Sequence, residues 1–168
     1  LPINRKQKVF PNGTLVIENV ERMSDQATYT CVAKNSQGYS VRGNLELQVM
    51  VVPKIAPFIA GPEPAFLGDY FALQCIITHG DQPVRIEWTI NNETANSVQG
   101  ARISNNDRRS SVLTIESLEA KHAGLYNCTA TNAAGVASHT TELVVKVPPR
   151  WILEPTDKAF AQGSDAKV

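Results

Sequence analysis

Apolar and polar residues alternate along several short stretches of the chain, and two of these stretches end at a proline. The clearest alternation covers residues 14–20, 47–54, 111–118 and 143–150. Alternation over about four to eight residues predicts a β-strand with one buried face. No apolar pattern with the period of an α-helix is long enough for a helix, and we expect a helical turn only near residues 119–123. The pattern therefore predicts an all-β fold.

The phase of the alternation assigns strand residues to a face. If Cys75 points into the core, so do the residues two and four positions away, because successive side chains of a strand point to opposite faces. The inward set is then Phe71, Leu73, Ile77, Leu113 and Ile115. The outward set is Ala72, Gln74, Ile76, Val112, Thr114 and Glu116.

The chain contains an internal repeat. Its markers recur 97 positions apart (128 minus 31), which pairs Tyr29 with Tyr126, Cys31 with Cys128, Asn35 with Asn132 and Gly38 with Gly135. A repeat of this length lies at the small end of the range of domain sizes, so one kind of domain occurs more than once. We expect the C-terminal half of a domain (strands D to G) in residues 1–51, a complete domain in residues 52–147 and the N-terminal start of a further domain in residues 148–168.

The complete unit has the residue spacing of an immunoglobulin-like (Ig) β-sandwich. Trp88 follows Cys75 by 13 positions, Cys128 follows Cys75 by 53, and Tyr126 stands two residues before Cys128. In this fold the cysteines face each other across two sheets, the tryptophan packs on their bridge, and the tyrosine hydroxyl holds the corner before strand F. We therefore expect a disulfide between Cys75 and Cys128 in a tandem array of sandwiches.

The first unit repeats part of this signature. Tyr29 is its corner tyrosine, and Cys31 takes the place of Cys128. We expect the partner of Cys31 to lie upstream of residue 1, which leaves Cys31 unpaired in this chain.

Composition and charge argue against several classes of function. Lysine plus arginine equals aspartate plus glutamate at 16 each, so no net field favours nucleic acid or anionic lipid. No segment approaches the roughly 20 apolar residues of a membrane span, and residues 1–25 lack the pattern of a signal peptide. Acidic calcium motifs, glycine-rich phosphate loops and nucleophile elbows are missing from the sequence. We expect no enzyme activity, no cofactor and no metal.

The histidines give no sign of a metal site. His79, His122 and His139 fall on a loop, a corner and a strand, without metal-ligand spacing to a cysteine or carboxylate. We expect them to be solvated. His122 stands where the first unit has Asp25. In such corners the acid pairs with an arginine at the start of strand D, so we expect Arg102 to lack a partner and the corner to be weaker.

Sequons of the form N-x-[ST] make the chain a candidate glycoprotein. They begin at Asn12, Asn92 and Asn127. Asn92 is the best candidate because it follows strand C on an exposed loop. Asn12 lies in a sequence that equally describes a turn between strands D and E, and Asn127 is next to the expected disulfide, where a glycan would be hindered.

The outward residues of one sheet have the composition of an interaction surface. Ile76 and Val112 should be exposed apolar residues on the same face, surrounded by polar ones, which is how protein interfaces are built. The alternative is that single exposed apolar residues are ordinary surface. The candidate interface residues are Gln74, Ile76, Arg102, Ser104, Asn105, Asp107, Val112 and Thr114.

The stretches VKVPPRWILEPTDKAFAQGSDAKV (145–168) and PNGTLVIENVERMSDQATYTCVAKN (11–35) closely resemble the Ig arrays of the insect Down syndrome cell adhesion molecules, the Dscam family. The resemblance spans the whole chain, whereas the cysteine, tryptophan and tyrosine pattern alone would fit any intermediate-set Ig protein. It implies the extracellular part of a single-pass plasma membrane receptor. It further implies isoform-specific homophilic binding in neurogenesis, axon guidance and self-avoidance, a role in immune recognition, and alternative splicing of some Ig domains.

Three functions remain open from the sequence. The favoured one is a homophilic adhesion module, whose partner is an identical copy bound through the sheet of strands A, B, D and E. A structural spacer in a tandem array is the second, although such spacers usually work in a reducing cytosol, where a disulfide and sequons are not expected. A receptor for a different protein or a glycan is the third, and the sequence does not separate it from the first.

Overall fold

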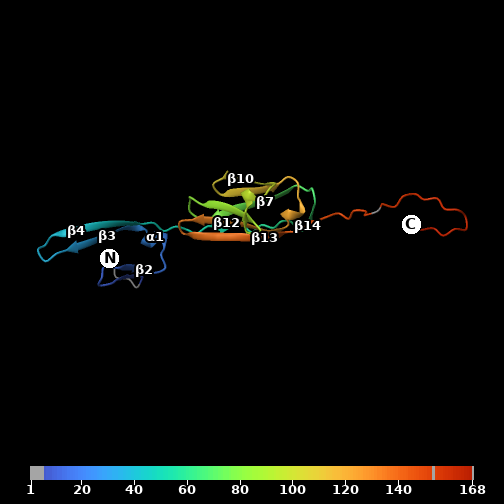
Figure 1. The fold of residues 1–168 in the computed structure, drawn as a ribbon. Coiled ribbons are helices and arrows are strands. Elements are labelled where there is room, and N and C mark those ends of the chain that lie inside the picture. Colours follow the sequence, from blue (N-terminus) through green and yellow to red (C-terminus); the bar gives the residue numbers. More distant parts are fainter. Residues whose placement is uncertain (1–5, 153, 168) are drawn as a thin grey trace.

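The computed structural model describes residues 6–152 and 154–167. Figure 1 shows a central body of β-strands between two hairpins near the N-terminus and an extended segment that leads to the C-terminus. Among the described residues after Lys146 there is no strand. Nowhere in the described ranges is a helix both long and apolar enough to cross a membrane.

The central body is a sandwich of two four-stranded antiparallel sheets. The strand order of the first sheet is β10 (Ala101–Asp107), β11 (Ser110–Ile115), β7 (Phe71–His79) and β5 (Lys54–Ile55). The order of the second is β13 (Gly135–Leu143), β12 (Gly124–Asn132), β8 (Arg85–Ile90) and β9 (Glu93–Thr94). A short parallel pair, β6 (Ala65–Phe66) with β14 (Val145–Lys146), stands beside them. This is the arrangement of an Ig sandwich, so the predicted fold class is confirmed.

The strands bury every second residue, in the phase that the sequence predicts. Along β7, Phe71, Leu73, Cys75 and Ile77 are buried and the residues between them are exposed. The register places Leu113 of β11 directly opposite Leu73, so the inward side chains of neighbouring strands form continuous rows.

The core forms where the inner faces of the two sheets meet. Cys75 on β7 and Cys128 on β12 are joined by a disulfide with a Cα–Cα distance of 6.4 Å. Trp88 on β8 lies opposite Cys128 and is 1% exposed. Its indole N–H donates to the hydroxyl of buried Ser111 at 3.0 Å, so two buried polar groups satisfy each other. An aromatic side chain of this size contributes about 3 kcal/mol or more when buried.

Short helical segments lie between the strands. η2 (Ala120–His122) forms where the sequence predicts a helical turn. The sequence did not reveal α1 (Arg22–Asp25) or η1 (Ala95–Ser97), because three or four residues are too few to show an apolar period. α1 occupies the corner of the first unit that corresponds to η2.

Residues 6–51 form two hairpins. Hairpin one pairs β1 (Gln7–Val9) with β2 (Leu15–Ile17), and hairpin two pairs β3 (Ala27–Lys34) with β4 (Ser40–Leu47). Asp25 is the one buried residue among those described in this segment. Its carboxylate accepts hydrogen bonds from Lys6 Nζ at 2.6 Å and from the Glu21 N–H at 2.7 Å, and these two bonds lower the pKa of Asp25.

The prediction that the histidines are solvated is wrong for His122. The residue is fully buried, at 0% exposure. Its Nδ1 accepts a hydrogen bond from the Glu119 N–H at 2.9 Å, and its Nε2 lies 2.8 Å from the Gln99 carbonyl oxygen. Because Nδ1 is the acceptor, the proton of the neutral ring is on Nε2 and is donated to Gln99. His122 therefore ties the corner to the turn before β10.

The expected loss of a partner for Arg102 is also wrong. Arg102 Nη1 lies 2.8 Å from Glu116 Oε1, and both side chains are well exposed. His122 holds the corner through its own two hydrogen bonds, so the corner does not need an acid-arginine pair. Of the other histidines, His139 is half-buried with Nε2 2.8 Å from the Phe58 carbonyl oxygen, whereas His79 is exposed.

The corner tyrosine makes stability depend on pH in the alkaline range. Tyr126 is 0% exposed and donates its hydroxyl hydrogen to the His122 carbonyl at 2.7 Å. Burial raises the pKa of Tyr126 to about 12 from the ordinary value of 10.0. Between these two pH values the unfolded state loses a proton that the folded state keeps. The free energy of unfolding should therefore fall as the pH rises through this window, by up to about 1.4 kcal/mol per pH unit.

Urea unfolding at a series of pH values tests this prediction. Tyr126→Phe should remove most of the alkaline decline, since phenylalanine has no proton to lose. Tyr70→Phe is the matched control, because Tyr70 is 67% exposed, and it should leave the decline in place. Equal slopes in both variants would contradict the assignment to Tyr126.

Candidate functional site

The outward face of the first sheet brings most of the predicted interface residues together. In register, Val112 on the middle strand β11 lies between Gln74 of β7 and Ser104 of β10. Thr114 lies between Ala72 and Arg102 in the next row. Directly opposite residues of neighbouring strands have Cβ atoms about 4.5–5.5 Å apart. The outward face is therefore one continuous surface, made of Gln74, Ile76, Arg102, Ser104, Val112 and Thr114.

The two apolar residues of this face differ in exposure. Ile76 is 41% exposed, as an interface anchor should be. Val112 is half-buried rather than exposed, which corrects the prediction. The reason is its position on the middle strand, where Gln74 and Ser104 stand on either side of it. Ile76 is thus the more exposed of the two apolar residues of this face.

Two of the predicted residues do not share the outward face in this way. Asn105 lies opposite Ser111, whose side chain is buried against Trp88, so Asn105 is on the inward side of β10 near its end. Asp107 follows a register shift and accepts a hydrogen bond from the Arg109 N–H at 2.6 Å. That hydrogen bond lowers the pKa of Asp107 and commits its carboxylate to the turn between β10 and β11.

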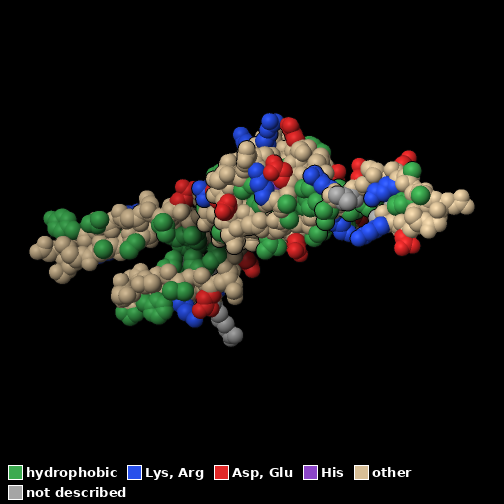
Figure 2. All heavy atoms as spheres, turned by 45° about the vertical axis from the view of Figure 1, so that its right-hand side comes forward, with side chains coloured by type: hydrophobic (Ala, Val, Ile, Leu, Met, Phe, Trp, Pro, Cys, Tyr) green, Lys and Arg blue, Asp and Glu red, His purple; other side chains and the backbone are tan. Residues whose placement is uncertain are grey.

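The surface of the central body carries charges of both signs. Figure 2 shows basic and acidic side chains interspersed over it, with apolar side chains between them. On the candidate face, Arg102 is neutralised by Glu116, and the remaining members are uncharged. A face of this kind recognises a partner through shape and hydrogen bonds rather than through net charge.

The sequon asparagines lie in different settings. Asn92 is exposed in the turn between β8 and β9, with φ +67°. Asn12 is exposed, and its Oδ1 accepts a hydrogen bond from the Thr14 N–H at 3.1 Å within the turn between β1 and β2. Asn127 is half-buried on β12, where its Nδ2 donates to Thr129 and its Oδ1 accepts from Thr140. The side-chain nitrogen of Asn127, the atom that would carry a glycan, is thus engaged in a hydrogen bond, whereas Asn92 is an exposed residue in a turn.

The second sheet also has an exposed outward face, which was not among the predicted interface residues. Leu125 of β12 and Val136 of β13 are 52% and 61% exposed. Parity counted from Cys128 would have found Leu125, because it stands an odd number of positions from an inward residue. Between the two apolar residues the face is polar, with Asn127, Thr129, Ser138 and Thr140.

The two packed sheets and the disulfide that joins them define the central body as an Ig domain. The immunoglobulin domain family model matches residues 53–132. The chain is 60% identical over 169 residues to the cell adhesion molecule Dscam1 of Drosophila melanogaster, a match that covers 100% of this chain and 8% of that protein. It therefore spans less than a tenth of this curated relative.

Solved structures give the same relationship. The crystal structure of the N-terminal eight Ig domains of Down Syndrome Cell Adhesion Molecule isoform 1.30.30 is 63% identical, with a TM-score of 0.73, over 99% of this chain and 21% of that one. The structure of the Dscam1 Ig7 domain, isoform 5, is 38% identical, with a TM-score of 0.55, over 56% of this chain and 97% of that one. The chain belongs to the Dscam family of cell adhesion molecules.

Proposed function

We propose that the central unit, residues 52–147, binds an identical copy of itself and thereby gives an adhesion receptor isoform-specific self-recognition. The contact surface is the outward face of β10, β11 and β7. The observation that carries the proposal is exposed Ile76, which lies opposite Ser110 at one end of a mostly uncharged polar face. A two-fold contact places the same residues on both sides, and a face that combines an apolar residue with uncharged polar ones can meet its own copy without repulsion between like charges.

Related proposals concern the longer protein. We infer that the chain is part of the extracellular region of a single-pass plasma membrane protein that functions in axon guidance and self-avoidance. The disulfide supports an oxidising compartment, because cytosolic thiols stay reduced. Asn92 is the sequon best placed to carry a glycan there.

Analytical ultracentrifugation of the whole chain over a hundredfold concentration range tests self-binding. The measurement uses Cys31→Ser protein, since the exposed thiol of Cys31 could form a covalent dimer. Ile76→Asp places an uncompensated carboxylate within the contact and should abolish the dimer, with a loss of affinity of about a hundredfold or more.

The matched control is Leu125→Asp, which makes the same change at an exposed apolar strand residue of the other sheet. It should leave the dimer intact. A dimer that survives Ile76→Asp but not Leu125→Asp would move the contact to the second sheet. A monomer at every concentration would favour the spacer, and binding only to a different protein would favour the heterophilic receptor.

A further inference from the structure

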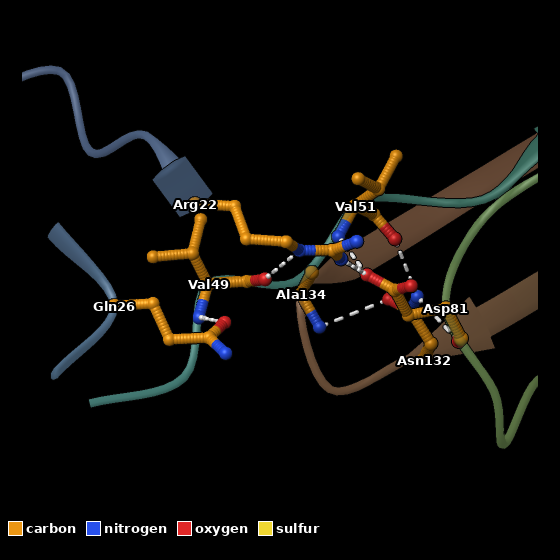
Figure 3. A network of polar contacts seen from close by, with 7 residues as sticks. All are labelled: Arg22, Gln26, Val49, Val51, Asp81, Asn132 and Ala134. Carbon is orange, nitrogen blue, oxygen red and sulfur yellow. Dashed lines mark hydrogen bonds and ion pairs between the residues drawn. The ribbon is translucent and has the colours of Figure 1, made fainter. Parts of the chain in front are cut away.

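The segment that joins the hairpins to the central sandwich is held on both sides of its backbone. The Val51 N–H donates to Asp81 Oδ2 at 2.7 Å, and the Val51 carbonyl accepts from the Asp81 N–H at 3.1 Å. Asn132 Nδ2 donates to the same carbonyl at 2.7 Å. Figure 3 shows these side chains converging on Val51 from separate parts of the chain. A connecting residue with its N–H and C=O both bonded has little freedom to rotate.

One arginine of the first unit reaches across to this point. Arg22 lies on α1, and its Nη2 forms an ion pair with Asp81 Oδ2, while its Nε donates to the Val49 carbonyl at 3.0 Å. The Val49 N–H in turn donates to Gln26 Oε1 at 3.3 Å. The Asp81 carboxylate is therefore shared between the connecting segment and the first unit (Figure 3).

Asn132 has two roles. Its Oδ1 accepts the N–H groups of Ala134 and Gly135, at 2.9 and 3.1 Å, and so forms the turn between β12 and β13. Asn35 forms the equivalent turn in the first unit through the same kind of bonds. Asn132 Nδ2 additionally donates to the carbonyls of Val51 and Asp81. The turn would need only the oxygen, so the bonds made by the nitrogen are a separate feature of the joint.

Packing restricts the segment as well. Pro53 is buried, and a Cβ on Gly80 would lie 2.8 Å from the Pro53 Cα atom. A Cβ on Gly135 would lie 3.2 Å from a methyl of Val52. The backbone of the central unit can thus approach the connecting segment closely only because these two positions lack a side chain.

We propose that Arg22, residues 49–53, Asp81 and Asn132 form a rigid joint that fixes the angle between the first unit and the central sandwich. Free movement between adjacent domains is the usual expectation, unless the interface is extensive or specifically bonded. The exposed Arg22–Asp81 ion pair contributes little stability by itself. Its role is to select one orientation of the first unit relative to the sandwich. Asp81 is the residue that contacts both Arg22 and the connecting segment. This inference does not depend on which face of the sandwich binds a partner.

Nuclear magnetic resonance of the whole chain tests the joint. Residual dipolar couplings from β3 and β4 and from the central sheets should fit one alignment tensor in the unaltered chain. Asp81→Ala should require two tensors and should abolish the exchange protection of the Val51 amide. Arg22→Gln, a change at an exposed side chain outside the sandwich, should also require two tensors. Arg85→Gln breaks another surface ion pair, with Glu87, and should keep one tensor.

A second pair of variants distinguishes crowding at the joint from backbone strain at a glycine with positive φ. Gly80→Ala and Gly61→Ala both place a side chain at φ +127°, but only Gly80 is crowded by Pro53, since the nearest atom to a Gly61 Cβ is 3.7 Å away. The couplings of Gly80→Ala should require two alignment tensors, whereas those of Gly61→Ala should fit one. The proposal is overturned if the unaltered chain already needs two tensors, or if Asp81→Ala and Gly80→Ala both still fit one.

Discussion

Removing the disulfide by replacing Cys75 and Cys128 together with alanine is expected to lower the free energy of unfolding by about 4 kcal/mol. The bridge joins residues 53 positions apart, and it stabilises the fold by limiting the conformations of the unfolded chain. Closing a loop of that length corresponds to about 4 kcal/mol in the chain-entropy description. A domain of ordinary stability has only about 5–15 kcal/mol in total, so the loss would take a large share of it.

Urea denaturation, followed by the fluorescence of buried Trp88, measures this change. Cys31→Ser is the control, because Cys31 is exposed and free, and it should alter the free energy of unfolding by less than about 0.5 kcal/mol. A loss below about 1 kcal/mol in the double variant would contradict the prediction. It would mean that packing around Trp88, rather than the covalent bond, holds the two sheets together.

Replacing His122 with alanine should lower the free energy of unfolding by about 3 kcal/mol. The substitution removes the partners of the Glu119 N–H and of the Gln99 carbonyl, and it leaves a cavity at a fully buried position. Gly100 packs against the ring, with its Cβ position 3.2 Å from Nε2, and has no side chain that could fill the space.

Two further variants make the test of His122 specific. His122→Asn keeps a donor and an acceptor on the side chain and should lose less stability than alanine does. His79→Ala changes an exposed histidine and should leave stability unchanged. Thermal or urea unfolding compares the three. Equal losses in the alanine and asparagine variants would show that packing, and not the hydrogen bonds, accounts for the effect.

The predicted inward residues of β7 are confirmed because successive side chains of a regular strand alternate between its two faces. Once Cys75 was placed inward, the burial of Leu73 and Ile77 followed, and β7 has that pattern. The predicted exposure of Val112 was wrong because parity gives the direction of a side chain but not the size of its neighbours. Its burial was decided by Gln74 and Ser104 on the adjoining strands.

The errors at the corner have a similar origin. The sequence showed that His122 replaces Asp25 of the first unit, but it did not show that the imidazole points inward to Glu119 and Gln99. The sequence also did not indicate that Arg102, on β10, would pair with Glu116, which directly follows the neighbouring strand β11. The contact of His122 with Gln99 and that of Arg102 with Glu116 join residues that are brought together only by the pairing and packing of several elements, whereas Glu119 is three residues from His122 and bonds to it within the cap of η2.

The sequence by itself determined the class of fold, the strand faces and the place of the disulfide. These follow from local alternation and from the spacing of a few residues, Cys75, Trp88, Tyr126 and Cys128. Both can be read from the order of the residues alone. The tertiary structure alone decided the contact of His122 with Gln99, the pairing of Arg102 with Glu116, and the joint at Asp81. Those features depend on distances between residues far apart in sequence, and such distances are set only when the sheets pack and the connecting segment lies against them.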